Sequence, residues 1–143
     1  MFYLVAFFVF AIDLSIKAAA STFLAPAGSV PIIKGFLHLT YVLNSGVAFG
    51  LFPDQRLPLV LIGVAICAIV IYFYASAKKE EILLKIYLAI IMGGSLGNLF
   101  DRVFFGRVID YIDFRVFPVF NFADIAINLG VFLIIFDLFL KRK

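Results

Sequence analysis

Cysteine and histidine are nearly missing from this sequence, since each occurs once, as Cys67 and His38. A single cysteine excludes an intramolecular disulfide and a thiolate metal cluster. A single histidine excludes a zinc peptidase of the H-E-x-x-H type. We expect Cys67 to be a small buried hydrophobic residue and His38 to be a loop residue without chemistry. The sequence therefore predicts neither a metal nor a cofactor.

Tryptophan is absent, so the six tyrosines must supply whatever aromatic anchoring exists at a membrane interface. Charge is also sparse, and 65% of the 143 residues are apolar, with a mean hydropathy of +1.16. Soluble globular domains have an apolar share of about 45–50%. The net charge of +3 is scattered along the chain rather than striped on one face, which argues against nucleic-acid binding. The composition thus predicts an integral membrane protein of one domain.

Four apolar segments are long enough to span a membrane, because ~20 helical residues cross a hydrocarbon core of ~30 Å. We expect them at about residues 1–20, 59–75, 82–100 and 120–140. The first begins without charge and lacks a clean cleavage pattern, which favours a retained helix over a removed signal peptide. Gly93 and Gly97 give the third a small-xxx-small face, which is typical of close helix packing.

Glycine and proline punctuate residues 21–58, which argues against a long helix in this region. The segment GFLHLTYVL, residues 35–43, is rich in β-formers and predicts a strand. Residues 30–33 could pair with it as a short antiparallel partner. Such a sheet must lie outside the lipid, because open sheet edges avoid hydrocarbon. Residues 101–119 are expected to form a second loop.

Acids and amides gather between residues 93 and 124, beside two strongly apolar runs. A charge at the bilayer centre costs roughly 2.5–3.5 kcal/mol, so ionisable groups near membrane depth indicate a functional site. Asp13 and Lys17 lie four residues apart on one helix face. They either form a self-neutralising pair that shapes the helix end or brace a polar site. Arg102 is a natural partner for a nearby carboxylate, in the simplest case an interfacial salt bridge.

The parity of four spans brings the candidate residues together. The ends of spans one and three, the start of span four and both long loops share one side of the membrane, so these side chains converge there: Asp13, Lys17, Asn44, Asn98, Asp101, Arg102, Asp110, Asn121 and Asp124.

The distribution of cations predicts the orientation in the membrane. The side opposite the candidate site carries six cations, Lys78, Lys79, Lys85, Lys141, Arg142 and Lys143. The candidate side carries five, Lys34, Arg56, Arg102, Arg107 and Arg115. The positive-inside rule therefore predicts cytosolic termini. We expect Asp137, near the opposite end of span four, to pair with Lys141.

Two aspartates at one polar site, without a metal ligand set, suggest hydrolysis by a carboxylate dyad. Neighbouring carboxylates split their titrations, so that one is protonated while the other is ionised. A serine/lysine peptidase is disfavoured, because Ser15 and Lys17 lie two positions apart and point to different helix faces. A small proton- or ion-conducting membrane protein is the alternative from another class, with the aspartates as relay groups.

Several motifs, in this order and spacing, carry a resemblance: Asp13-x-x-x-Lys17, NSGVAFG (residues 44–50), GGSLGNLFDR (93–102), GRVIDYID (106–113) and FNFAD (120–124). Together they resemble bacterial lipoprotein signal peptidase, the type II signal peptidase, over essentially the whole chain. The resemblance implies an aspartyl endopeptidase of the bacterial inner membrane, with four transmembrane helices and a small periplasmic β-cradle. It also implies cleavage of a prolipoprotein just before a diacylglyceryl-modified cysteine.

The resemblance implies that Asp110 and Asp124 are the catalytic pair. Other positions match substrate-binding or supporting positions of the family: Asp13, Lys17, Asn44, Gly46, Asn98, Arg102, Asn121 and Ala123. The sequence departs from the usual family pattern at four positions. Leu14 stands where the family usually has a polar residue, and Ile16 stands where it has Ser or Thr. Val47 replaces the usual Ala, and Tyr111 replaces the usual Phe. We expect a monomer whose partners are the lipid-modified prolipoprotein and membrane lipids, with its active site near the periplasmic face.

Overall fold

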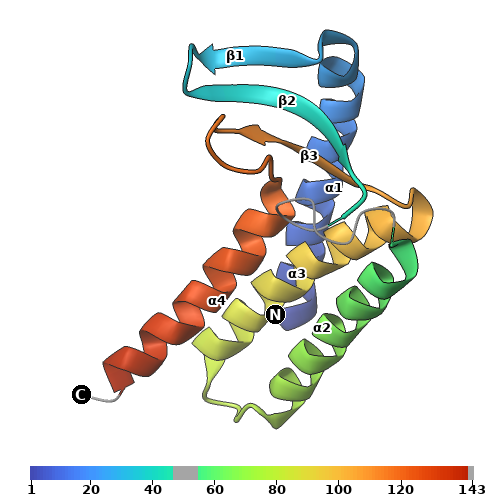
Figure 1. Cartoon of the computed structure of the whole chain (residues 1–143). Coiled ribbons are helices and arrows are strands. Elements are labelled where there is room, and N and C mark those ends of the chain that lie inside the picture. The colour runs from blue at the N-terminus through green and yellow to red at the C-terminus, as the bar shows by residue number, and fades with distance from the viewer. Residues whose placement is uncertain (47–54, 142–143) are drawn as a thin grey trace.

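The computed structural model describes residues 1–46 and 55–141, which form a helical bundle with a small sheet at one end (Figure 1). In chain order the elements are α1 (Phe2–Ala27), β1 (Ser29–Ile33), β2 (Leu37–Asn44), α2 (Arg56–Ser76), α3 (Ile82–Phe104), β3 (Val108–Asp113) and α4 (Phe122–Lys141). Helix α1 begins and helix α4 ends away from the sheet, as the parity of four spans requires (Figure 1).

Helix α3 is the centre of the bundle, because it packs against α1, α2 and α4. All four helices in the described ranges are long and apolar enough to cross a membrane, with mean hydropathies of 1.9, 2.6, 1.7 and 2.1 in chain order. The most apolar stretch of α3 is 50% buried inside the protein, whereas the corresponding share is 17–22% in the other helices. The exposed apolar faces of the outer three helices are therefore the surfaces available to lipid, and the predicted fold class is confirmed.

Three helices extend further than the sequence suggested, and for α1 and α2 the reason is that proline is tolerated near a helix end. Helix α1 continues to Ala27 and contains Pro26, which its last turn tolerates, and it ends at Gly28, whose φ of 71° suits glycine. Helix α2 begins at Arg56, so that Pro58 lies in its first turn, where the missing N–H costs no helical hydrogen bond. Helix α3 runs on to Phe104 rather than ending near residue 100.

The sheet has three antiparallel strands in the order β1-β2-β3. The predicted pairing of residues 30–33 with the strand near residues 35–43 is confirmed, and Pro31 lies on the edge strand, where proline is tolerated. Residues 101–119 were expected to form a loop, but they contain strand β3, although its two aspartates are unfavourable strand residues. His38 lies on β2 rather than in a loop, and Cys67 is only partly buried, at the edge of the apolar core.

Glycines let α1 and α4 approach the central helix closely, as predicted for Gly93 and Gly97. A Cβ atom at Gly93 would lie 2.6 Å from the carbonyl oxygen of Ala6, and one at Gly94 would lie 2.6 Å from that of Ala123. A Cβ atom at Gly97 would collide with the Asp13 carboxylate. The small face of α3 therefore fixes the distance between the helices that carry the polar residues.

We expect Gly93→Ala to destabilise the protein by about 1–3 kcal/mol, because the added methyl group meets the Ala6 carbonyl oxygen and the Cβ atom of Val9, which move only with α1 itself. The measurement is thermal unfolding in one detergent. Gly63→Ala is the matched control, since the three atoms nearest its Cβ atom all belong to the side chain of Leu99, and the closest of them, the terminal Cδ1, lies at 3.0 Å. Equal melting temperatures for the two variants would contradict this account of the α1–α3 contact.

Candidate active site

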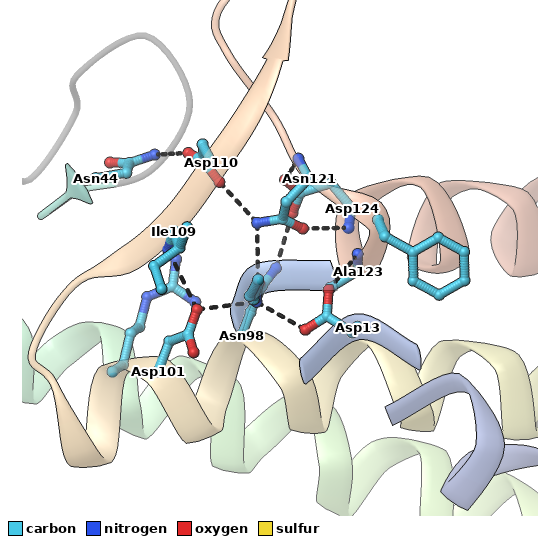
Figure 2. Close-up of polar contacts among 12 residues, drawn as sticks. Asp13, Asn44, Asn98, Asp101, Ile109, Asp110, Asn121, Ala123 and Asp124 are labelled. Atoms are coloured by element: carbon cyan, nitrogen blue, oxygen red, sulfur yellow. Dashed lines mark hydrogen bonds and ion pairs between the residues drawn. The ribbon is translucent and has the colours of Figure 1, made fainter. Parts of the chain in front are cut away.

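The polar residues predicted to converge do so between the sheet and the bundle, where β2, β3 and the sheet-side parts of α1, α3 and α4 meet (Figure 2). Asn121, which is completely buried, is the centre of this cluster. Its Nδ2 donates to Oδ1 of Asp110 at 2.7 Å and to Oδ1 of Asn98 at 3.1 Å. Its backbone N–H donates to Oδ2 of Asp124 at 3.1 Å, so one residue binds both candidate carboxylates.

Asn121 and Asp124 also form a reciprocal cap at the start of α4. The side-chain oxygen of Asn121 accepts a hydrogen bond from the Asp124 backbone N–H at 3.0 Å, while the Asp124 carboxylate accepts from the Asn121 backbone. This is the capping-box arrangement, in which two otherwise unpaired donors are satisfied by each other's side chains. The local helix start therefore fixes the position of the Asp124 carboxyl group.

Asp110 is held from two sides on β3. It is 2% exposed, and Asn44 at the end of β2 donates to its Oδ2 at 2.8 Å, opposite the bond from Asn121. Burial raises the pKa of Asp110 to about 6, with a further contribution from the charge of Asp124, although the two amide donors act against this. Asp124 is only half-buried and accepts from Asn98 Nδ2 at 2.8 Å. The two carboxyl groups therefore occupy different environments.

Lys17 is a buried cation between two buried carboxylates. Its Nζ lies 2.8 Å from Asp13 Oδ2, 2.9 Å from Asp101 Oδ2 and 3.0 Å from Asn98 Oδ1. Asp13 also accepts from the backbone N–H of Ala123 at 3.0 Å, and Asp101 accepts from that of Ile109 at 3.2 Å. The Asp13–Lys17 pair thus contacts α3 and α4 and braces the polar site. The alternative, a pair that only shapes the end of α1, is wrong.

Arg102 does not form the salt bridge expected for it within residues 1–46 and 55–141. The carboxylate that precedes it, Asp101, is taken by Lys17. In the same ranges, Nη2 of Arg102 lies 3.5 Å from the carbonyl oxygen of Gly46, and its Nε is buried without a hydrogen-bond partner. Gly46 itself donates to Asn44 Oδ1 at 2.9 Å. Among the described residues, the guanidinium group of Arg102 therefore keeps an unpaired donor at the cavity that Asp110 and Asp124 also line.

A cavity of about 640 Å³ opens onto this cluster, within the range typical of small-molecule sites. Asp110 and Asp124 both line it. Asn44, Asn98 and Arg102 add polar groups at one end, and apolar residues of α4 and of the segment before it line the rest, among them Val119, Phe120, Ile125, Leu129 and Phe132. The arrangement joins a charged end to an apolar channel along α4.

All ten predicted site residues belong to one connected network, but the later part of the NSGVAFG motif, residues 47–50, lies outside the described residues. The aspartates Asp113 and Asp137 stay apart from this network. Asp113 accepts from Thr40 at 2.8 Å on the sheet, and Asp137 pairs with Lys141 at 2.6 Å, as predicted.

Sequence reasoning missed the role of Tyr111, whose hydroxyl accepts a hydrogen bond from the Phe122 backbone N–H at 3.0 Å. In the described ranges no three His, Cys, Asp or Glu residues are grouped to hold a metal.

A family model described as signal peptidase (SPase) II matches residues 5–140. The chain belongs to the signal peptidase II family. Among curated members, the lipoprotein signal peptidase of Desulfitobacterium hafniense is 43% identical over 136 residues, covering 94% of this chain and 90% of the relative. That of Moorella thermoacetica is 42% identical over 139 residues, covering 97% and 93%.

Two solved structures share this fold. A bacterial membrane enzyme determined by the in meso method at 2.3 Å resolution superposes with a TM-score of 0.89 at 30% identity, covering 98% of this chain and 88% of that one. A second, at 1.9 Å resolution, gives a TM-score of 0.83 at 32% identity, covering 94% and 90%. The fold described above is therefore that of a bacterial membrane enzyme.

We expect Lys17→Met to destabilise this signal peptidase II family member by about 3–5 kcal/mol, because Asp13 and Asp101 would lose their shared cation while remaining buried. Unfolding in one detergent, followed by circular dichroism, measures the change. The control is Lys141→Met, which removes a cation that is 61% exposed and paired at the end of α4. A Lys17→Met variant as stable as this control would contradict the role of Lys17 as the shared partner of two buried carboxylates.

Proposed function

We propose that this chain is an aspartyl endopeptidase that removes the signal peptide from diacylglyceryl-modified prolipoproteins, cutting just before the lipidated cysteine. One observation carries the proposal: Asp110 from β3 and Asp124 from α4 line the same cavity and are bound by the same residue, Asn121. Family membership supports the peptidase activity, and two carboxyl groups at one cavity supply a general acid and a general base.

In the first step, the ionised carboxylate of Asp124 takes a proton from a water molecule, whose oxygen attacks the carbonyl carbon of the scissile amide. Asp110 donates its proton to the carbonyl oxygen, which gives a neutral gem-diol. In the second step, Asp124 passes its new proton to the amide nitrogen, one diol hydroxyl returns its proton to Asp110, and the C–N bond breaks. The products are a carboxylic acid and a free amine, and both aspartates return to their initial states.

The environments of the two aspartates support this division of roles. Asp110 is almost completely buried, and its raised pKa favours the protonated form. Asp124 is half-buried, lines the cavity and accepts hydrogen bonds from Asn98 and from the Asn121 backbone, which places it to act as the base. A protonated Asp110 beside an ionised Asp124 is the arrangement that general acid–base hydrolysis requires.

The shape of the cavity supports a lipid-modified substrate. Ile125, Leu129 and Phe132 continue the cavity along one apolar face of α4, in the direction of the bilayer. Because the substrate is already in the membrane, only the difference between cavity and lipid contributes to affinity. The lipid therefore acts by fixing the depth of the scissile bond, since a misplacement of ~1 Å can cost ~100-fold in rate. Arg102 and Asn44 are placed to bind the peptide backbone.

A proton- or ion-conducting function fits the described residues less well. A conduction path needs polar groups through the full depth of the membrane. Here the buried polar and charged residues, such as Lys17, Asn98 and Asn121, gather towards the sheet, while the buried residues at the opposite end of the bundle are apolar, as in the cluster of Phe2, Leu88 and related residues.

We further propose that the protein lies in the bacterial inner membrane as a monomer, with the sheet and the active site near the periplasmic face. The orientation is supported by the distribution of cations, because the side of the membrane opposite the sheet carries more of them and is therefore expected to be cytosolic. In this orientation α1 begins and α4 ends at the cytosolic side.

We expect Asp110→Asn and Asp124→Asn each to abolish cleavage of a lipidated precursor while the protein remains folded, because either change removes a proton donor or acceptor from the dyad. Asp113→Asn and Asp137→Asn are matched controls outside the cavity and should retain activity. Turnover by the purified enzymes is the measurement. Wild-type turnover in either of the first two variants would exclude the dyad.

The pH dependence of kcat/KM should show a basic limb near pH 6, because raising the pH through the pKa of Asp110 removes its proton. The measured value belongs to the coupled pair of carboxyl groups. Asn44 donates to the Asp110 carboxylate and so lowers this pKa. Asn44→Ala should therefore move the basic limb to higher pH, whereas Thr40→Ala, which affects Asp113, should not. A limb that stays in place or moves to lower pH in Asn44→Ala would refute the assignment.

The same precursor with and without its diacylglyceryl group, in one membrane mimic, tests the role of the lipid. We expect the unlipidated precursor to be cleaved at least about tenfold more slowly, because its scissile bond is not held at the depth of the carboxyl groups. Leu129→Arg should slow cleavage of the lipidated form selectively, since it places a charge in the apolar part of the cavity. Equal cleavage of both precursors by the wild type would exclude positioning by the lipid.

A further inference from the structure

The first turn of α4, residues 122–124, is capped by side chains of β3, of α1 and of Asn121, the residue directly before the helix. The first N–H groups of a helix have no partner within the helix and need one from elsewhere. Here the Phe122 N–H donates to the Tyr111 hydroxyl of β3, the Ala123 N–H to Asp13 of α1, and the Asp124 N–H to Asn121, each at 3.0 Å. Each of these three N–H groups therefore has a side-chain acceptor.

Tyr111 is the member of this cap that the motifs do not explain. It lies next to Asp110 in the chain, is 6% exposed, and does not line the cavity. The family resemblance implies phenylalanine at this position, so the hydroxyl group is a feature of this sequence. Burial raises the pKa of Tyr111 to about 12, which keeps the hydroxyl protonated at physiological pH.

We propose that Tyr111 is a positioning residue whose hydroxyl fixes the first turn of α4 against β3, and with it Asp124 against Asp110. The proposal rests on the proposed function, in which these two acids act as a dyad. Tyr111 and Asp110 are adjacent on β3, while Phe122 and Asp124 share one helical turn, so the Tyr111–Phe122 hydrogen bond joins the two backbone segments that carry the carboxyl groups.

The consequence of losing the hydroxyl follows from the burial of this region. A buried N–H without a partner is unfavourable, so the turn shifts until the Phe122 N–H finds another acceptor or water. Asp124 lies in the same turn and moves with it. Tyr111 does not line the cavity, and Leu129 and Phe132 lie beyond the first turn of α4, so this shift acts chiefly on the geometry of the dyad.

The first test is Tyr111→Phe, with Tyr72→Phe on the lipid-facing surface of α2 as the matched control. We expect kcat to fall roughly fivefold to thirtyfold in Tyr111→Phe, with KM within about twofold of the wild type, and no change in the control. An unchanged kcat, or a rise in KM alone, would overturn the proposal.

A double-mutant cycle separates positioning from a general loss of stability. Phe122→Pro removes the N–H that the hydroxyl serves, and proline is favourable at the first helical position. Phe122→Ala removes the same side chain but keeps the N–H. Tyr111→Phe should therefore lower kcat in the Phe122→Ala background and leave it unchanged in the Phe122→Pro background. Equal losses in both backgrounds would overturn the proposal.

Amide hydrogen exchange of the first turn of α4 gives a readout that does not depend on catalysis. Exchange at residues 122 and 123 should be faster in Tyr111→Phe than in the wild type, and unchanged in Tyr72→Phe. Unchanged exchange overturns the cap, and faster exchange with unchanged kcat overturns its positioning role. Wild-type turnover in Asp124→Asn would instead refute the proposed function, and the exchange result would still report on the cap.

Discussion

The ammonium group of Lys17 is the constraint on which the rest of the site depends. One cation faces two carboxylates, Asp13 and Asp101, and none of the three side chains is appreciably exposed. Each carboxylate also binds a backbone N–H of another element, at the start of α4 and in β3. A single buried cation and its two carboxylate partners therefore link α1, α3, α4 and β3, and the two aspartates at the cavity are placed by their attachment to the last two of these elements.

Much of this arrangement could be predicted from the sequence, because membrane depth makes polar residues conspicuous. Hydropathy and length were sufficient for the four spanning helices. The parity of the spans brought the polar residues to one side, and the ordered motifs identified the family that the comparison with signal peptidase II confirms. The pairing of β1 with β2 was also predictable, since a segment rich in β-formers followed a short apolar partner.

The remaining features depend on tertiary contacts that local patterns do not contain. Strand β3 forms because β2 pairs with it, although its aspartates are poor strand formers. Arg102 directly follows Asp101 in the chain, yet the Asp101 carboxylate pairs with Lys17 of α1, which lies more than eighty residues earlier in the sequence. The hydroxyl of Tyr111 meets the start of α4 only once the segment between β3 and α4 turns back on itself, through the pairing of Ile112 with Phe120.

The position of Asp13 and Lys17 within one helix bears on how the chain is assembled in the bilayer. Their ion pair of 2.8 Å is internal to α1, so this helix can enter the membrane with its two charges already neutralised. Asp101 follows later in the chain, on α3, and adds a second carboxylate to this pair in the folded protein. The same lysine is thus both an intrahelical ion-pair partner and a tertiary contact, and α1 carries within itself a partner for each of its two charges.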